Sequence, residues 1–98
     1  MNESFINALQ RLVGPKNVLI GPKIADYLPS ILAEGQAIEV QAVVFPDSMA
    51  ALAAISLLCQ KQNQTIIMYD GLDKLKLNSA WTGLEVLISL EKISGKDG

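Results

Sequence analysis

The sequence predicts an α/β fold: a small mixed sheet of three or four strands with a β-α-β unit and an N-terminal helix. Residues 42–45 and 65–69 are short apolar runs rich in β-branched side chains, which is typical of buried strands. Between them, residues 48–62 are long enough to form the helix that links parallel strands, and Ser48 can cap its start. In residues 84–90 apolar side chains alternate, which predicts a third strand with one buried face.

The N-terminal segment predicts a helix over residues 3–13. Asn2 or Ser4 can cap its start, and the pair Gly14-Pro15 can end it. Its apolar side chains recur at helical spacing and comprise Phe5, Ile6, Leu9, Leu12 and Val13.

The segment between this helix and the first strand predicts little regular structure. Residues 17–20 are a short apolar run that indicates a brief extended piece packed against the helix. Residues 23–34 contain Pro29, so we expect isolated helical turns in an otherwise irregular region. Residues 1–93 are expected to form one small domain, because 98 residues suffice for a single core, and residues 94–98 a flexible tail.

Composition excludes several classes of function. The net charge is −2 and the few lysines are scattered, so we expect no nucleic-acid binding. The longest charge-free apolar run, residues 49–59, is shorter than the roughly 20 residues that span a bilayer, and the N-terminus lacks a basic leader. We therefore expect a cytoplasmic protein without membrane contact.

The sequence also offers few groups for catalysis or metal binding. It has no histidine, which is the commonest general base and metal ligand, and its lone Cys59 excludes an internal disulfide. Cys59 shares the apolar side of the 48–62 helix with Leu52 and Ile55, which indicates a buried thiol. We expect no catalytic residue and no metal site.

The order of these elements resembles a known family. The segments LVGPKNV, VVFP and LISLEKI, with the helices and strands around them, are similar to the start of the FAD-binding domain of FAD-linked oxidases of the vanillyl-alcohol oxidase type. The likeness covers residues 9–93 and is greatest to the FAD-binding subunits of cyanobacterial glycolate oxidases. It implies the first lobe of that domain, without the lobe that closes over the flavin.

The resemblance also identifies the loop that would hold the cofactor. In the family a loop of the type P-x-G-S/G-G-T/S wraps the FAD pyrophosphate with its backbone amides. This sequence has Met68 at the proline position, Asp70 and Leu72 at glycine positions, and Gly71 and Asp73 at small-residue positions. The corresponding vestigial loop comprises Tyr69, Asp70, Gly71, Leu72, Asp73 and Lys74.

The changes in this loop oppose a bound phosphate. Glycine lets backbone amides approach a phosphate closely, and only Gly71 remains. A carboxylate about 4 Å from a phosphate charge costs roughly 4 kcal/mol at an effective dielectric constant near 20. We therefore expect no bound cofactor, with FAD as the alternative.

The outer side of the 48–62 helix is the candidate for a binding surface. Residues 48–60 carry no charge, whereas a solvated helix normally presents acids and lysines. The alternative is that its alanines are good helix formers on an ordinary surface. Trp81 either joins the surface or covers the end of the sheet. The predicted partner-binding residues are Met49, Ala50, Ala53, Ala54, Leu57, Leu58 and Trp81.

These observations predict a non-catalytic protein-binding or assembly module built on a flavin-oxidase lobe. Its partner would be another protein or a second copy, bound through the 48–62 helix. The resemblance to cyanobacterial glycolate oxidases implies a link to carbon fixation, such as assembly of the carboxysome, or to photorespiration. The alternative is a split or truncated FAD-binding subunit of a glycolate-type 2-hydroxy-acid oxidoreductase.

Overall fold

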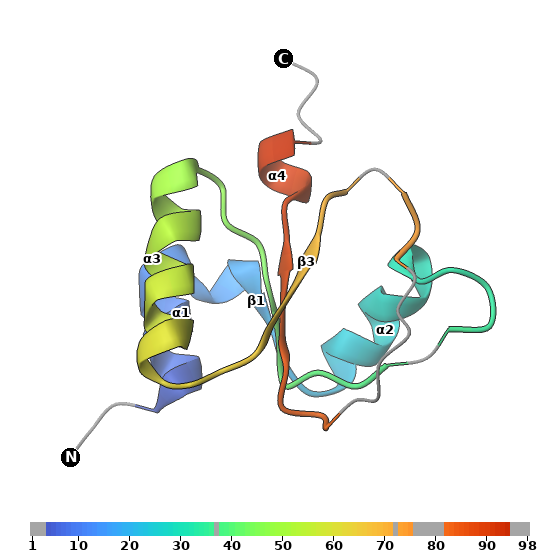
Figure 1. Cartoon of the computed structure of the whole chain (residues 1–98), viewed down its shortest axis with the longest axis horizontal. Coiled ribbons are helices and arrows are strands. Elements are labelled where there is room, and N and C mark those ends of the chain that lie inside the picture. The colour runs from blue at the N-terminus through green and yellow to red at the C-terminus, as the bar shows by residue number, and fades with distance from the viewer. Residues whose placement is uncertain (1–3, 37, 72, 76–81, 95–98) are drawn as a thin grey trace.

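The computed structural model describes residues 4–36, 38–71, 73–75 and 82–94. Within these residues the chain forms a mixed four-stranded sheet with helices on both faces (Figure 1). The elements in chain order are α1 (Phe5–Val13), the short 3-10 helix η1 (Pro15–Asn17), β1 (Val18–Leu19), α2 (Pro22–Ile31), β2 (Ala42–Val44), α3 (Met49–Lys61), β3 (Ile66–Tyr69), β4 (Val86–Ser89) and α4 (Glu91–Ser94). The predicted fold class is confirmed.

The sheet has the strand order β1-β2-β4-β3. β4 pairs in parallel with β2 on one side, with Val43 opposite Leu87, and with β3 on the other, with Ile67 opposite Leu87. β1 pairs antiparallel with β2 at the edge. The predicted unit of strand, helix and strand is therefore present, but β4 lies between its two parallel strands.

Two apolar cores lie on opposite faces of the sheet. In Figure 1, α1 and α3 cover one face and α2 covers the other. The core beneath α2 comprises Ile24, Leu28, Ile31, Ile38, Val40, Val43, Ile67, Tyr69 and Leu87. The core beneath α1 and α3 comprises Leu9, Val18, Ala42, Val44, Ile55, Cys59, Val86 and Ile88. Both cores are needed because each face of a strand such as β4 must be covered.

The expectation that β4 has one buried face is wrong. All residues of Val86–Ser89 are buried, because the strand lies in the middle of the sheet with helices above and below. Leu84, expected on the buried face, is 65% exposed and precedes the strand. Glu85 instead closes the turn before it, accepting hydrogen bonds from Thr82 N (3.2 Å) and Gly83 N (3.1 Å).

The expectation of an irregular region over residues 23–34 is also wrong. Residues 22–31 form the single helix α2, and Pro29 lies inside its last turn. A proline there removes one backbone hydrogen bond, but the helix ends two residues later, so little else is lost. Burial of Ile24, Leu28 and Ile31 against the sheet favours the helix. The spacing of these three residues is typical of a helix, but Pro29 argued against a continuous helix in the sequence.

The other two long helices match their predictions closely. Ser4 Oγ accepts a hydrogen bond from Asn7 N at 3.1 Å and caps α1. Ser48 Oγ accepts one from Ala51 N at 3.1 Å and caps α3. This capping fixes where α3 begins, and burial of Ile55 and Cys59 in the core fixes which side of the helix faces the sheet.

Candidate functional site

The predicted cofactor loop lies where β3 ends, at the carboxyl edge of the parallel strands. Open α/β sheets commonly bind ligands at this edge. A hollow of about 310 Å³ lies here, between Tyr69, the segment 73–75 and Leu90, which follows β4. Leu72 falls outside the described residues. The loop therefore lies where ligands commonly bind in this class of fold, and the charge and size of its side chains determine which ligand could bind there.

The charge around this hollow is predominantly acidic. The pKa of Tyr69 is raised, first by burial and then by the negative charges of Glu91, Asp70 and Asp73. The Asp73 N–H is directed at Asp70 Oδ1, 3.4 Å away. The backbone amide of Asp73, which could face a phosphate, is thus directed at the Asp70 carboxylate. The negative charges of Asp70, Asp73 and Glu91 would also repel a phosphate group bound in this hollow.

Gly71 has a structural role in this loop. Its φ of +83° lies in the left-handed region, which favours glycine. A Cβ added here would lie 3.2 Å from both Cα and Cγ of Glu91. The small residue therefore allows the loop to pack against α4, and this packing explains why glycine is required.

The loop is anchored to the end of α2. Lys74 Nζ donates a hydrogen bond to the Ser30 carbonyl oxygen at 2.5 Å. Leu75 N donates to Ile31 O at 2.6 Å, and Leu75 pairs with Leu32 as an isolated parallel bridge. The ammonium group of Lys74 is thus hydrogen-bonded to a backbone carbonyl oxygen of α2. The described residues of the loop do not fit the pyrophosphate of FAD.

A polar contact that the sequence analysis missed lies beside the loop. The Tyr27 hydroxyl of α2 donates to Glu91 Oε2 at 2.6 Å and lies 3.3 Å from Ser89 Oγ. Burial and the hydrogen bond to Glu91 raise the pKa of Tyr27, as does the charge of Glu91. The Tyr27 ring also packs edge-on against Phe45, with ring centres 5.2 Å apart. The contact joins α2, β4 and α4, and no local sequence signal identifies it.

The outer face of α3 is apolar and open to solvent. Met49 is 65% exposed and Leu57 is 52% exposed, and Ala50 and Ala53 are exposed beside them. We call these four residues the α3 stripe. They follow one side of the helix, opposite the buried Ile55.

The other predicted partner-binding residues are placed differently. Ala54 and Leu58 are half-buried at the flank of α3, and Leu58 packs against the core shared with α1. Trp81 falls outside the described residues. The structure therefore brings four of the seven predicted residues together on one exposed side.

Groups for catalysis and metal binding are scarce in the described part of the chain. Cys59 is fully buried, and burial raises the pKa of its thiol, so the reactive thiolate is disfavoured. Among the described residues no cluster of three acidic, cysteine or histidine side chains could hold a metal ion. Within the same residues, no helix has both the length and the apolar character needed to cross a membrane.

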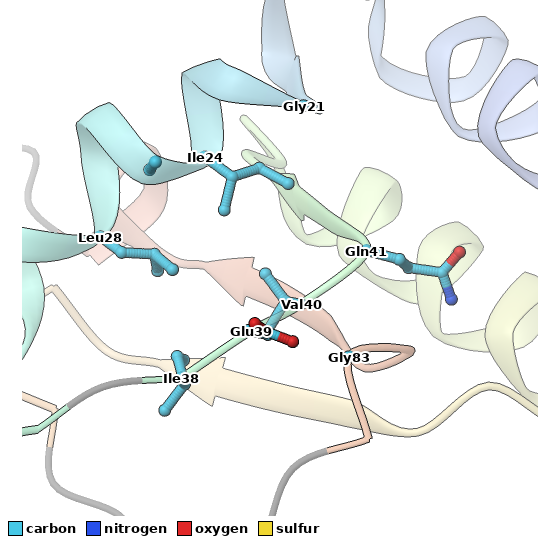
Figure 2. A pocket seen from close by; sticks show the side chains of 9 residues that line it. Gly21, Ile24, Leu28, Ile38, Glu39, Val40, Gln41 and Gly83 are labelled. Atoms are coloured by element: carbon cyan, nitrogen blue, oxygen red, sulfur yellow. The ribbon is translucent and has the colours of Figure 1, made fainter.

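A second hollow, of about 330 Å³, lies at the opposite ends of the parallel strands (Figure 2). Ile24 and Leu28 of α2 project toward the segment 38–41. Gly83 lies beside this segment, next to Glu39. Gln41 Nε2 is engaged by Gln64 Oε1 (2.6 Å) and by the Leu84 carbonyl oxygen. The hollow offers contacts to an apolar group, and Glu39 is the one acidic side chain among the described residues that line it.

Solved structures of FAD-linked oxidases share this fold. p-Cresol methylhydroxylase with bound substrate aligns over 91% of this chain and 18% of its own, with a TM-score of 0.69 and 17% identity. Phl p 4, a grass pollen allergen with glucose dehydrogenase activity, aligns over 91% and 20%, with a TM-score of 0.69 and 12% identity. A Phl p 4 variant that is a glucose oxidase aligns over 93% and 21%, with a TM-score of 0.70 and 12% identity.

These comparisons confirm the fold expected from the resemblance and extend no further. At 12–17% identity they show the fold alone, and the chain spans about a fifth of the length of these enzymes. No protein-family model and no curated protein matches the sequence. The chain has the fold of the corresponding part of these enzymes, and the loop that follows β3 carries acidic residues.

Proposed function

We propose that this chain is a non-catalytic protein-binding or assembly module built on a flavin-oxidase lobe, and that it binds its partner through the α3 stripe. The main support for this proposal is that Met49 and Leu57 are exposed on a helix face that has no charged residue before Lys61. Surface apolar residues are ordinary when scattered singly, whereas a continuous apolar face marks an interaction site.

Energetics limit how tightly the stripe alone can bind. Fully burying a large apolar side chain contributes about 1.5–3 kcal/mol, and Met49 and Leu57 are 65% and 52% exposed, so together they contribute about 2–4 kcal/mol. Association costs about 4–15 kcal/mol in lost freedom of motion. Neighbouring surface must therefore join the stripe, or the complex is weak and reversible.

Leu57→Glu should abolish partner binding while leaving the fold intact. A carboxylate within the contact would lose its water on binding, which is costly without a partner charge. The measurement is capture from a cyanobacterial extract with wild-type and variant bait, with partners identified by mass spectrometry and the fold checked by circular dichroism. Asn7→Glu adds the same charge at an exposed position of α1 and is the matched control.

The proposal fails if Leu57→Glu retains every partner that the wild-type protein captures. It also fails if Asn7→Glu loses the same partners, because net charge would then explain the loss. Unfolding of Leu57→Glu would contradict the exposed position of this side chain, and the milder Leu57→Gln then tests the surface.

The alternative is a split or truncated FAD-binding subunit of a glycolate-type oxidoreductase that a second chain completes. The hollow at the end of β3 favours it, because ligands of α/β folds bind at this edge. The acidic side chains of Asp70, Asp73 and Glu91 oppose it.

We expect the purified chain to carry no flavin and not to bind added FAD with micromolar or better affinity. Repulsion between the phosphates and the carboxylates of Asp70 and Asp73 is the physical reason. The checks are the visible absorbance of the purified protein and quenching of flavin fluorescence on titration. A yellow protein, or binding in the micromolar range, would contradict this expectation and favour the alternative.

The proposal extends to a cellular setting through the resemblance to cyanobacterial glycolate oxidases. We propose a cytoplasmic role in carbon fixation or photorespiration, for example as an assembly or accessory factor of the carboxysome. A tagged chain should then sediment with carboxysomes from the native host, and Leu57→Glu should remain in the supernatant. Wild-type protein found only in the supernatant would remove the carboxysome from the proposal.

A further inference from the structure

We propose that the partner of the α3 stripe is a second copy of this chain, and that the two α3 helices pack antiparallel about a two-fold axis near Ala53. The inference rests on the proposed function and adds the identity and orientation of the partner. Three features of α3 support it: the symmetric placement of its large side chains, its terminal charges and its small central residues.

The large apolar side chains of the stripe are placed symmetrically. Met49 lies four residues before Ala53 and Leu57 lies four residues after it. Residues four apart lie on the same side of a helix, one turn from each other. In an antiparallel pair centred at Ala53, Met49 of each copy therefore meets Leu57 of the other. A two-fold contact requires this self-complementarity.

The two charged residues that flank the stripe are also placed nearly symmetrically about Ala53. Asp47 precedes α3 and Lys61 ends it, and both side chains are exposed. The midpoint between these positions is residue 54, one residue from the midpoint of Met49 and Leu57. The antiparallel arrangement thus places Asp47 of each copy near Lys61 of the other, and it opposes the two helix dipoles favourably. A parallel arrangement would bring like charges together.

Small side chains allow the two helices to approach. Ala53 is exposed at the centre of the stripe, where a bulky residue would hold the axes apart, and Ala50 is a second small exposed residue near its start. Packed helices lie about 8–10 Å apart, depending on the side chains between them. Alanines at the crossing and larger residues on either side permit close contact over most of the helix.

The size of the contact predicts a weak dimer. The 13-residue α3 is about 20 Å long. One helix pair of this length buries less than the roughly 1,200–2,000 Å² of a stable interface. We expect association that depends on concentration in the range from micromolar to millimolar.

The test is a charge exchange followed by sedimentation equilibrium, which separates the 10.6 kDa monomer from the dimer. Asp47→Lys alone and Lys61→Asp alone should each weaken the dimer about tenfold at low salt, because two attractive pairs become repulsive. The double variant should regain wild-type association. An equimolar mixture of the two single variants should form a mixed dimer, in which both pairs are again attractive.

Two controls define the face and the origin of the effect. Leu57→Glu should remove the dimer, and Asn7→Glu should retain it. High salt should reduce the difference between the charge variants, since exposed ion pairs are screened. Melting curves of each variant show whether a charge change near the ends of α3 has altered the fold.

The outcomes separate this inference from the proposed function. A wild-type chain that stays monomeric to millimolar concentration overturns the dimer, whereas partner capture that is lost in Leu57→Glu would still support the binding face. A dimer that survives Leu57→Glu overturns the stripe as its contact. A dimer that the double variant and the mixture fail to restore overturns the antiparallel arrangement.

Discussion

Replacing Ile55 with alanine is expected to lower the free energy of unfolding by about 2–5 kcal/mol. The Ile55 side chain is fully buried between α3 and the sheet, so the change removes apolar contacts and leaves a cavity. Small domains unfold with a total free energy of only about 5–15 kcal/mol, so the loss is a large part of the stability. Urea denaturation followed by circular dichroism measures it.

Leu57→Ala is the matched control for this prediction. It removes a side chain of the same size from the same helix, two residues further along, where the residue is 52% exposed. The free energy of unfolding should change by no more than about 0.5 kcal/mol. The comparison should be made at low micromolar concentration, where dimerisation contributes little. Equal losses in the two variants would contradict the orientation of α3, and with it the α3 stripe.

The orientation of α3 could be predicted because its signals are local. Ser48 caps the helix in the structure as the sequence indicates, and Ile55 and Cys59 lie on the buried side as their spacing predicts. Both signals depend on residues within a few turns of each other. Because the buried side was identified, the opposite side could be predicted to be exposed, which is why the exposure of Ala53 and Leu57 was predictable without knowledge of the sheet.

The order of the strands could not be predicted in the same way. β4 lies between β2 and β3, so both its faces are covered and the alternation read in residues 84–90 does not correspond to one buried face. Strand order depends on pairing between residues far apart in the chain. Local periodicity contains no information about it.

The cofactor loop shows a further limit of prediction from sequence. Its acidic composition was evident, and the charges of Asp70 and Asp73 act on Tyr69 as their positions suggest. Gly71 was interpreted as the surviving glycine of a phosphate-binding loop, whereas the structure packs it against Glu91. The partner residue is 20 positions away in the sequence, so its contact required the folded chain.

The two tyrosines of the chain, Tyr27 and Tyr69, are expected to resist deprotonation while the protein is folded. Burial is the main cause of the raised pKa at both residues. The hydrogen bond to Glu91 adds to it at Tyr27, and the negative charges of Glu91, Asp70 and Asp73 add to it at Tyr69. Tyrosinate absorbance in the native protein should therefore appear at higher pH than in the unfolded chain.

The raised pKa values determine how stability depends on pH. The folded chain holds both phenolic protons more tightly than the unfolded chain, whose tyrosines titrate near pH 10. The stabilising contribution is therefore complete below about pH 10 and is lost as the pH rises above it. Urea denaturation at a series of alkaline pH values should show the free energy of unfolding falling in this range.

Tyr27→Phe isolates the contribution of the hydrogen bond to Glu91. At neutral pH the variant should lose about 1.5–3 kcal/mol, the usual contribution of a hydrogen bond to a charged group. Above pH 10 its stability should fall less steeply than that of the wild-type protein, because one titrating group is gone. Tyr69→Phe is the companion variant, since it leaves Tyr27 as the single tyrosine. If Tyr27 in that variant titrates near pH 10 while circular dichroism remains native, the contact between α2 and α4 is not formed in solution.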